Sequence, residues 1–398
     1  MILGFEWYAP TKIICGQNSI DELGVFSRLL GKEALLVTGL ESMRRLGYVD
    51  RAKQSLEREG IIVQIYEGIP SEPEFNDITP LVQFARSNPP DFIVALGGGS
   101  VIDAAKCAAI ATTHPGNILD YCRGGRYANQ ITPSVLPVVA IPSTSGSGSE
   151  TSSYAVISNP GGGVKEVMSS PNIYPVLCII DPDLPMNAPN SVKLSSGLDV
   201  LAHSIESYIS TKASPVVETL SIGASGLVFR CLPSVIGSNG DLRAHAEMAV
   251  ASAMAGMAIA MGGTVMGHAI AHAWGAVAHV PHGLAVAGLL PWVIEVNKHS
   301  ARDKLARLWD TLSPSLESMS SGEKVQGLGG LLVEFYRNVG FDMSQVRSFM
   351  KGISVQEVAA VASRQAVMAL NPEPVTVEVI CQILRGISSG KSMEEFSI

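Results

Sequence analysis

The sequence predicts two domains: an α/β domain with a parallel sheet over residues 1–185, and an all-helical domain over residues 186–398. Three observations support this division. The chain has 398 residues, more than one hydrophobic core usually serves. Its first half alternates apolar runs with segments of helical spacing, which is typical of a parallel sheet with helical crossovers. Beyond the Pro-, Asp- and Asn-rich stretch at residues 181–189, long helical patterns follow with almost no strand signal.

The expected elements of the first domain are six strands with helices between them. Several of the strands are Val/Ile-rich runs bounded by Gly, Pro or Asp, as buried parallel strands tend to be. The expected strands are Lys12–Cys15, Ala34–Thr38, Ile61–Tyr66, Phe92–Leu96, Val135–Ile141 and Val176–Ile180. The expected helices are Ser42–Glu59, Asp77–Ser87 and Val101–Ala111 in the first domain, and Ser191–Ser210, Val216–Arg230, Leu242–Met261 and Ser300–Leu312 in the second.

Composition and charge disfavour two classes of partner. The net charge of -8 argues against a nucleic-acid binder, which normally has a basic face. The run from Met248 to Ile294 contains no Lys, Arg, Asp or Glu and is apolar enough to suggest a membrane span. It also contains four histidines, which are costly in lipid, so we expect buried helices of small residues around a polar site and no membrane partner. Six scattered cysteines without a CxxC pair indicate reduced thiols in a cytoplasmic protein.

A glycine-rich turn follows the fourth expected strand. The sequence Ala-Leu-Gly-Gly-Gly-Ser ends at Ser100 and precedes the helical pattern at Val101–Ala111. Gly97 and Gly98 would let the backbone approach a ligand, and the free N–H groups of the helix N-terminus attract a pyrophosphate. We expect Ser100 to be the N-cap, with Asp103 three residues on, as in a capping-box variant. A tight turn without a ligand is the alternative.

A second loop, Pro142–Glu150, is dense in hydroxyls and glycines and follows the fifth expected strand. Such a loop can hydrogen-bond phosphates, a ribose or an amide, although a flexible solvated loop is the alternative. Two such loops after strands of one sheet together indicate a cleft at the strand ends. The first strand–helix turn, Val37–Ser42, lacks the GxGxxG pattern, which favours a variant nucleotide-binding arrangement.

Candidate metal ligands gather in the second domain. Asp199 and His203 lie four residues apart in a helical pattern and therefore share one face. His268 and His272 repeat this spacing in another helix, and His282 follows soon after. These residues in an otherwise uncharged core favour a divalent transition-metal site, with satisfied core histidines as the alternative.

Taken together, these features resemble the iron-containing alcohol dehydrogenase family (group III alcohol dehydrogenases), over roughly Tyr8 to Glu295. The motifs are GGGSVIDAAK from Gly97, PSTSGSGSE from Pro142, GLDVLAHSIESY from Gly197 and GHAIAHAWGAVAHVPHG from Gly267. The resemblance implies a Rossmann-like, dehydroquinate-synthase-like α/β domain and an NAD(P)-dependent alcohol dehydrogenase. It further implies a small alcohol or aldehyde as substrate and a homodimer or higher homo-oligomer.

The resemblance also implies roles for individual residues. A metal would lie between the two domains, bind the substrate oxygen and act as a Lewis acid. The family makes it Fe(II), although three His and one Asp also suit Zn(II). His272 matches an additional active-site histidine, for which we expect a role in proton relay or substrate orientation. The implied metal ligands are Asp199, His203, His268 and His282, and the implied dinucleotide-site residues are Gly97, Gly98, Ser100, Asp103, Ser143, Thr144, Ser147 and Lys165.

The chain departs from the family pattern in the expected nucleotide and substrate sites. Gly39 stands where the family often has an Asp that would disfavour a 2′-phosphate, and Arg44 and Arg45 follow, so the sequence predicts that NADP(H) is accepted. The alternative is that both arginines are solvated. Ile259, Met261 and Tyr154 also differ from common family residues, either because they shape the substrate pocket or because they pack in the core.

Three rival functions use the same residues. A zinc-dependent enzyme similar to glycerol dehydrogenase would need only a different ion. A lyase similar to dehydroquinate synthase would need a basic pocket, to which the uncharged run Met248–Ile294 contributes no Lys or Arg. A non-enzymatic metal or nucleotide sensor would not need ligands and nucleotide loops together.

Overall fold

The computed structural model describes residues 4–159, 164–237, 240–314 and 319–390. The described residues form two compact units, which are treated one at a time below. The first unit comprises residues 8–188 and contains both sheets of the described chain. The second comprises residues 4–7 and the described residues from 189 onward. The boundary expected at residue 185 falls within the short helix α6 (Asp183–Met186), just before this division.

The main sheet of the first unit has six parallel strands in the order β1-β8-β5-β4-β2-β3. All six strands expected from the sequence are present, β1 with the expected ends and the other five with shifted ends. The strand expected from Val135 begins only at Val138, because Pro137 has no N–H to donate to the ladder. The strands are β1 (Lys12–Cys15), β2 (Glu33–Gly39), β3 (Ile62–Ile69), β4 (Phe92–Gly97), β5 (Val138–Pro142) and β8 (Leu177–Ile180).

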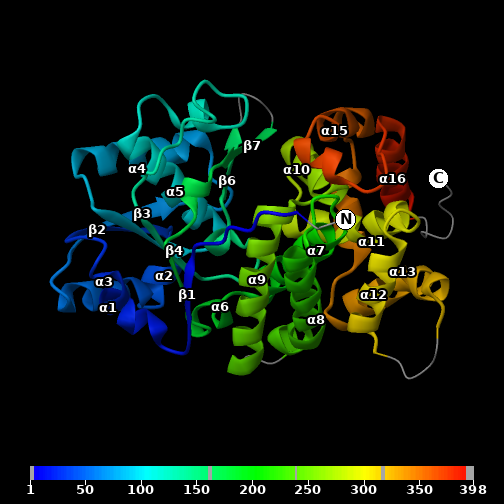
Figure 1. Ribbon diagram of the computed structural model, residues 1–398, viewed down its shortest axis with the longest axis horizontal. Helices are drawn as coiled ribbons and strands as arrows, with labels where there is room; N and C mark the ends of the chain where they lie inside the picture. The colour runs from blue at the N-terminus through cyan, green and yellow to red at the C-terminus, as the bar shows by residue number, and fades with distance from the viewer. Residues whose placement is uncertain (1–3, 160–163, 238–239, 315–318, 391–398) are drawn as a thin grey trace. The chain divides into compact units, whose positions relative to one another are not determined.

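Both faces of this sheet are covered, which explains its uninterrupted apolar strands. Alternate residues of β2 enter different cores: Leu35 and Val37 join one hydrophobic cluster, and Ala34 and Leu36 join the other. Figure 1 shows helices on both sides of the strands. Helices α4 (Phe75–Ser87) and α5 (Gly99–Thr113) cover one face, and α1 (Leu23–Ser27), α2 (Ser42–Arg45) and α3 (Tyr48–Arg58) cover the other.

Two features of the first unit differ from the prediction. The single helix expected over Ser42–Glu59 is broken between α2 and α3, because Gly47 takes a left-handed conformation with φ of 78°. An antiparallel hairpin of β6 (Tyr154–Asn159) and β7 (Val164–Ser169) was not predicted. Its strands are partly polar, so they lack the continuous Val/Ile runs by which several of the main strands were found.

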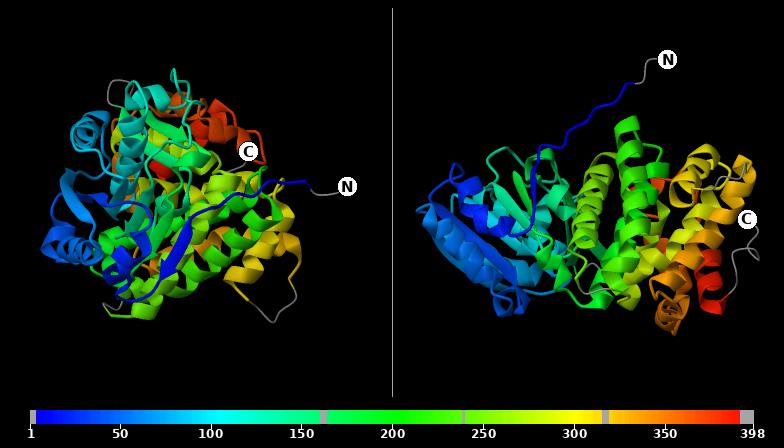
Figure 2. Two further views of the ribbon diagram at one scale, coloured as in Figure 1. Left: turned by 60° about the vertical axis from the view of Figure 1, so that its left-hand side comes forward. Right: turned by 90° about the horizontal axis from the view of Figure 1, so that it is seen from below.

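The second unit is helical, with no strand among its described residues, as the sequence predicts. Helix α8 continues seven residues beyond the expected end at Arg230, and α12 begins two residues later than expected. Figure 2 shows the same helices from two further directions. The helices are α7 (Asn190–Ile209), α8 (Pro215–Gly237), α9 (Leu242–Gly262), α10 (Met266–Ala278), α11 (His282–Asn297), α12 (Arg302–Leu312), α13 (Ser321–Asn338), α14 (Met343–Arg347), α15 (Val355–Ala362) and α16 (Val377–Ser389).

Small residues let the central helices of this unit approach one another closely. A Cβ at Gly283 of α11 would overlap the backbone oxygen of Ser195 in α7, and one at Gly262 would lie 2.8 Å from Val217. Helices α8 and α9 are long and apolar enough to cross a membrane by length and composition, a test that buried core helices also pass. Of the apolar 18-residue stretch that passes this test in each helix, 67% is buried inside the structure in α9 and 39% in α8.

Candidate metal centre and nucleotide-binding loops

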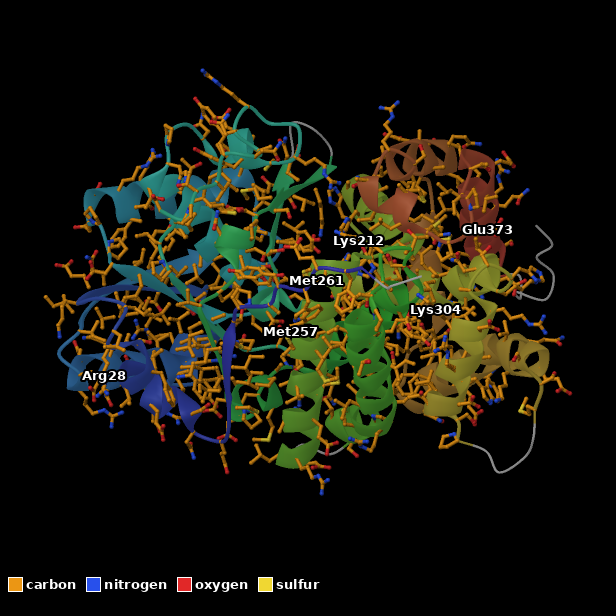
Figure 3. All side chains as sticks on the ribbon, in the orientation of Figure 1. Arg28, Lys212, Met257, Met261, Lys304 and Glu373 are labelled. Atoms are coloured by element: carbon orange, nitrogen blue, oxygen red, sulfur yellow. The ribbon has the colours of Figure 1, made fainter. Side chains whose placement is uncertain are left out.

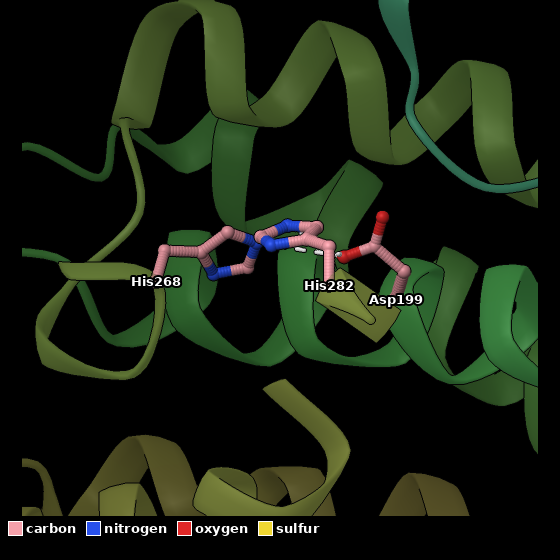
Figure 4. Close-up of side chains that lie close together, drawn as sticks. All are labelled: Asp199, His268 and His282. Carbon is pink, nitrogen blue, oxygen red and sulfur yellow. Dashed lines mark ion pairs between the residues drawn. The ribbon is translucent and has the colours of Figure 1, made fainter. Parts of the chain in front are cut away.

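Three histidine side chains from three helices converge on one carboxylate oxygen, Asp199 Oδ1, in the second unit. Asp199 Oδ1 lies 3.8 Å from His203 Nε2, 3.6 Å from His268 Nε2 and 3.6 Å from His282 Nε2. Asp199 and His203 come from α7, one turn apart, whereas His268 lies in the first turn of α10 and His282 begins α11. Figure 4 shows Asp199, His268 and His282 turned toward one another. The structure therefore brings the four expected ligands together.

These separations suit ligands that surround a common ion. They exceed the normal length of a hydrogen bond, about 2.7–3.2 Å. Donor atoms placed about 2.0–2.2 Å from a four-coordinate ion lie roughly 3.4 Å apart. Asp199 Oδ1 and His268 Nε2 are buried and have no hydrogen-bond partner among the described residues. Buried polar atoms seldom lack a partner, so three imidazole nitrogens and one carboxylate oxygen fit a divalent first-row metal ion.

The electrostatics of this site also call for a cation. Burial alone would raise the pKa of Asp199, but His203, His282 and His268 hold it well below its usual range. Burial alone would lower the pKa of His268, but Glu206 and Asp199 raise it to about 10. The two carboxylates thus favour a positive charge beside them, which a bound cation would supply.

The two candidate nucleotide loops of the first unit are in direct contact. They follow the neighbouring strands β4 and β5, and the backbone N–H of Ser143 donates to Gly97 O at 2.9 Å. A Cβ at Gly98 would lie 3.3 Å from Thr144 Oγ1, and one at Gly99 would lie 2.5 Å from Ser147 Oγ. Glycine is required at position 99 because a side chain there would push the two loops apart.

Comparison with known proteins agrees with this geometry. The family model described as "Iron-containing alcohol dehydrogenase" matches residues 10–182, and the model of the family's C-terminal part matches residues 193–388. The chain belongs to the iron-containing alcohol dehydrogenase family. The resemblance seen in the sequence is thereby confirmed, and so are the expected fold class and the activity of a metal-dependent, NAD(P)-linked alcohol dehydrogenase.

Several relatives cover most of this alcohol dehydrogenase. It is 32% identical to an NADPH-dependent butanol dehydrogenase of Clostridium saccharobutylicum, over 87% of this chain and 86% of the relative. It is 30% identical to a 1,3-propanediol dehydrogenase of Citrobacter freundii over 96% and 98%. It is 28% identical to an NAD-dependent methanol dehydrogenase of Bacillus methanolicus over 96% and 99%. The crystal structure of a 1,3-propanediol oxidoreductase superposes with a TM-score of 0.90 at 29% identity, over 97% of this chain and all of that one.

One buried carboxylate of this alcohol dehydrogenase was missed by sequence reasoning. Glu206 of α7 is fully buried, and its Oε1 lies 2.8 Å from His268 Nδ1. Its Oε2 accepts hydrogen bonds from the backbone N–H groups of Val265 at 2.7 Å and His268 at 3.2 Å. The available signal was a glutamate three residues after His203 in an otherwise apolar helical segment, which places both on one helix face.

His272 lies beside the four ligands. It is half-buried on α10, one turn after His268, and its ring stacks on that of His282 with centroids 5.2 Å apart. The rings of His268 and His272 are 6.1 Å apart and meet edge to face. The cluster of potential ligands around Asp199 includes His268 and His282 but neither His203 nor His272. The structure thus places His272 next to the candidate ligands His268 and His282.

The expected N-cap of α5 is wrong. The helix begins at Gly99 with Gly98 as N-cap and no side-chain cap. Ser100 Oγ instead accepts a hydrogen bond from the backbone N–H of Glu72 at 3.0 Å, because a serine inside the first turn points sideways to the neighbouring loop. Asp103 therefore forms no capping box, and its carboxylate accepts from Ser149 Oγ and, at 3.0 Å, from the backbone N–H of Val156.

A buried lysine, which sequence reasoning also missed, joins α5 to the second loop. The Lys106 ammonium donates to Ser149 O and Tyr154 O at 2.7 Å, and to Ser149 Oγ and Ser152 O at 3.0 Å. Burial lowers the pKa of Lys106 to about 8, so the group remains protonated at neutral pH. Lys165, on β7, forms an ion pair with Glu72 at 3.4 Å and is largely buried.

Of the two arginines considered as partners for a 2′-phosphate, Arg44 already forms ion pairs within this chain. Gly39 ends β2, where a Cβ would lie 3.9 Å from Val101 of α5. Arg44 on the following helix forms a bidentate ion pair with Glu67, with two N···O distances of 3.1 Å, and contacts Asp50 Oδ1 at 2.6 Å. Arg45 is exposed.

The three residues considered for the substrate pocket have different surroundings. Ile259 is buried in α9, whereas Met261, labelled in Figure 3 near the end of the same helix, is half-buried. Tyr154 begins β6 in the first unit, and burial raises the pKa of its hydroxyl.

Proposed function

We propose that this alcohol dehydrogenase interconverts a short, uncharged aldehyde and its alcohol at Fe(II) held by Asp199, His203, His268 and His282. The observation that carries the proposal is the set of three 3.6–3.8 Å separations around Asp199 Oδ1. Zn(II) is the alternative ion, because the site offers no thiolate that would separate the two by ligand softness. When bound, the ion polarises the substrate oxygen and stabilises its developing negative charge.

The surroundings of this site support an uncharged substrate. Helices α10 and α11 carry His268 and His282 and, up to Ile294, contain no Lys, Arg, Asp or Glu. An acidic or phosphorylated substrate would lack a cationic partner on these helices, which disfavours the lyase alternative. Butanol, methanol and 1,3-propanediol appear in the names of relatives, and all three are small and uncharged. Small alcohols and aldehydes are thus consistent with the family.

For His272 we propose proton relay or substrate orientation. Its half-buried ring stacks on a candidate ligand, so its imidazole lies close to the reacting oxygen in the proposed reaction. A neutral imidazole can hold or pass a proton near pH 7. The His272→Gln variant should lower kcat and change its pH profile while leaving metal content unchanged. Full activity with an unaltered profile would refute this role.

For the dinucleotide, we propose a site at the carboxyl ends of β2, β4 and β5. Direct contact between the two loops and the free N–H groups at the start of α5 support this proposal. Asp103, whose two oxygens accept hydrogen bonds from this chain, would support the loops, and Lys165 would lie at the site's edge. The proposed nucleotide-site residues are Gly39, Gly97, Gly98, Ser100, Asp103, Ser143, Thr144, Ser147 and Lys165.

We propose that both NAD(H) and NADP(H) are accepted. Gly39 presents no carboxylate to repel a 2′-phosphate, which favours NADP(H). Arg44, the candidate partner for that phosphate, is held by Glu67 and Asp50, so the local charge is not positive. A strong preference for NAD(H) would refute the proposal that NADP(H) is accepted.

We propose three further properties, which concern the two domains, the location and the assembly. The domain before about residue 185 would bind the dinucleotide, and the domain after it would bind the metal. The location would be cytoplasmic, since all six cysteines are free. The assembly would be at least a homodimer, by analogy with the family.

The deciding experiment measures NADH and NADPH oxidation with a panel of short aldehydes. Apoprotein would be reconstituted separately with Fe(II), Zn(II), Mn(II) or no metal. We expect turnover that depends on the metal and is lost in Asp199→Asn. His279→Asn is the matched control, because His279 is an exposed histidine at the end of α10, and Asn tolerates its left-handed conformation. Turnover that is equal with and without metal would refute the proposed centre.

A further inference from the structure

We propose that Glu206 is a positioning residue for the metal centre, which fixes the tautomer and orientation of the ligand His268. The proposal rests on the proposed function, since it takes His268 as a metal ligand. It assigns to Glu206 no contact with substrate or ion. Its basis is a set of three hydrogen bonds that this one carboxylate forms around the start of α10.

The three bonds decide which nitrogen of His268 carries a proton. The backbone N–H groups of Val265 and His268 can only donate, and both donate to Oε2 at 2.7 and 3.2 Å. Oε1 remains for His268 Nδ1 at 2.8 Å, and a carboxylate can only accept. Nδ1 must therefore be protonated, which leaves the lone pair of Nε2 for an ion. Nε2 is the nitrogen that lies 3.6 Å from Asp199 Oδ1.

The backbone is shaped to admit this carboxylate. Gly267 lies between the two backbone donors, Val265 and His268, and a Cβ there would overlap Glu206 Oε1 and lie 2.8 Å from Val293. Glu206 also satisfies two N–H groups at the N-terminus of α10, where negative charge is favourable. The same side chain thus holds the start of the helix and the ring of its first-turn histidine. Because Glu206 and the ligands Asp199 and His203 all come from α7, the two helices are locked in the register that the site requires.

The isosteric variant Glu206→Gln separates positioning from folding, because an amide cannot satisfy all three donors. With its oxygen toward Nδ1, the amide N–H₂ would face two backbone N–H groups. With its oxygen toward the backbone, the amide would donate to Nδ1, and the proton would move to Nε2, where it blocks the ion. The second arrangement leaves every group that Glu206 contacts with a hydrogen-bond partner in the apoprotein. We therefore expect apoprotein that folds with little loss of thermal stability but binds metal poorly.

The readout is metal affinity, measured by competition of Zn(II) and Co(II) between the apoprotein and a chromophoric chelator, with the Co(II) spectrum reporting coordination. We expect affinity to fall about 10–100-fold in Glu206→Gln, the usual loss when a partner of a metal-bound histidine is removed. Ser207→Ala is the matched control. It removes a buried hydrogen bond of 2.8 Å to Ser221 from the adjacent position of the same helix, without touching a ligand. Its metal affinity should remain unchanged.

The outcomes that overturn this proposal can be told apart from failure of the proposed metal centre. If wild-type apoprotein binds neither ion, the proposed function fails first. If wild-type protein binds and Glu206→Gln binds equally well, Glu206 does not position His268. Should Glu206→Gln fail to fold, Gly267→Ala decides, because it displaces the carboxylate without removing it. If Gly267→Ala protein folds and binds metal normally, the interaction serves the fold and not the ligand. The same conclusion follows if Gly267→Ala protein also fails to fold.

Discussion

The ion pairs of Arg44 lead to a quantitative prediction for nucleotide preference. In Glu67→Gln, a bidentate pair with two 3.1 Å contacts is lost, and Arg44 becomes available to a 2′-phosphate. Arg44 and Glu67 are 39% and 35% exposed, so solvent screens the pair, and its removal is worth about 1 kcal/mol at most. That corresponds to about a fivefold rise in the ratio of kcat/KM for NADPH to kcat/KM for NADH. Asp50 is 57% exposed and makes a single contact, so Asp50→Asn should change the ratio less than about twofold.

The assay compares both nucleotides with one aldehyde at low and high ionic strength. The gain should shrink at high salt, because exposed charges are screened. Glu57→Gln is the control, since Glu57 pairs with Lys53 on α3 and has no contact with Arg44. The gain must also disappear when Glu67→Gln is combined with Arg44→Ala. A ratio that is unchanged in Glu67→Gln, or that rises equally without Arg44, would refute the reasoning.

Three further predictions concern the loops, the metal and pH. Gly99→Ala should raise the KM for NADH at least about tenfold, because its Cβ would lie 2.5 Å from Ser147 Oγ; Gly16→Ala, with nothing within 4 Å, should not. Metal at about 100 times its Kd should stabilise the helical unit by about 2.7 kcal/mol, seen as a higher Tm by tryptophan fluorescence, and Asp199→Asn should abolish that gain. Burial, together with the charge of Lys193, lowers the pKa of His245 to about 4. His245 is thus neutral when folded but protonates below about pH 6.5 when unfolded. The stability that depends on it should be complete above pH 6.5 and fall by up to about 3 kcal/mol as pH drops toward 4. This dependence of the unfolding free energy on pH should vanish in His245→Gln. An equal dependence in both proteins would contradict its assignment to His245.

The parts of the structure that the sequence could predict are those that leave a local signal. Buried parallel strands such as β2 and β4 are continuous apolar runs, because helices cover both faces of the sheet. The proposed metal ligands could be singled out because Asp199 and His203 lie one turn apart and His268 interrupts a long uncharged segment. The break at Gly47 also left a signal, because a glycine lies inside the helical pattern. The helical spacing of the residues on both sides obscured this signal.

What sequence reasoning missed depends on contacts between distant segments. Lys106 lies in a helix of small apolar residues, and three of its four acceptors are backbone oxygens 43 to 48 residues away. Glu206 serves a histidine 62 residues away and two backbone N–H groups, which no spacing rule identifies. In both cases one buried charge satisfies several backbone groups, and backbone groups carry no sequence pattern.

This difference explains why the ligands were easier to predict than their supports. A ligand must be one of a few residue types with a donor atom near the ion, so its identity limits the choices. A supporting residue must only complete a hydrogen-bond network, and the network is known only once the helices are packed. Glu206 shows how much then depends on packing, because its carboxylate fits only where Gly267 omits a side chain. A glutamate and a glycine 61 positions apart thus act as one feature of the site. The requirement on each is testable separately, since Glu206→Gln changes the chemistry of the hydrogen bond and Gly267→Ala changes the space for it.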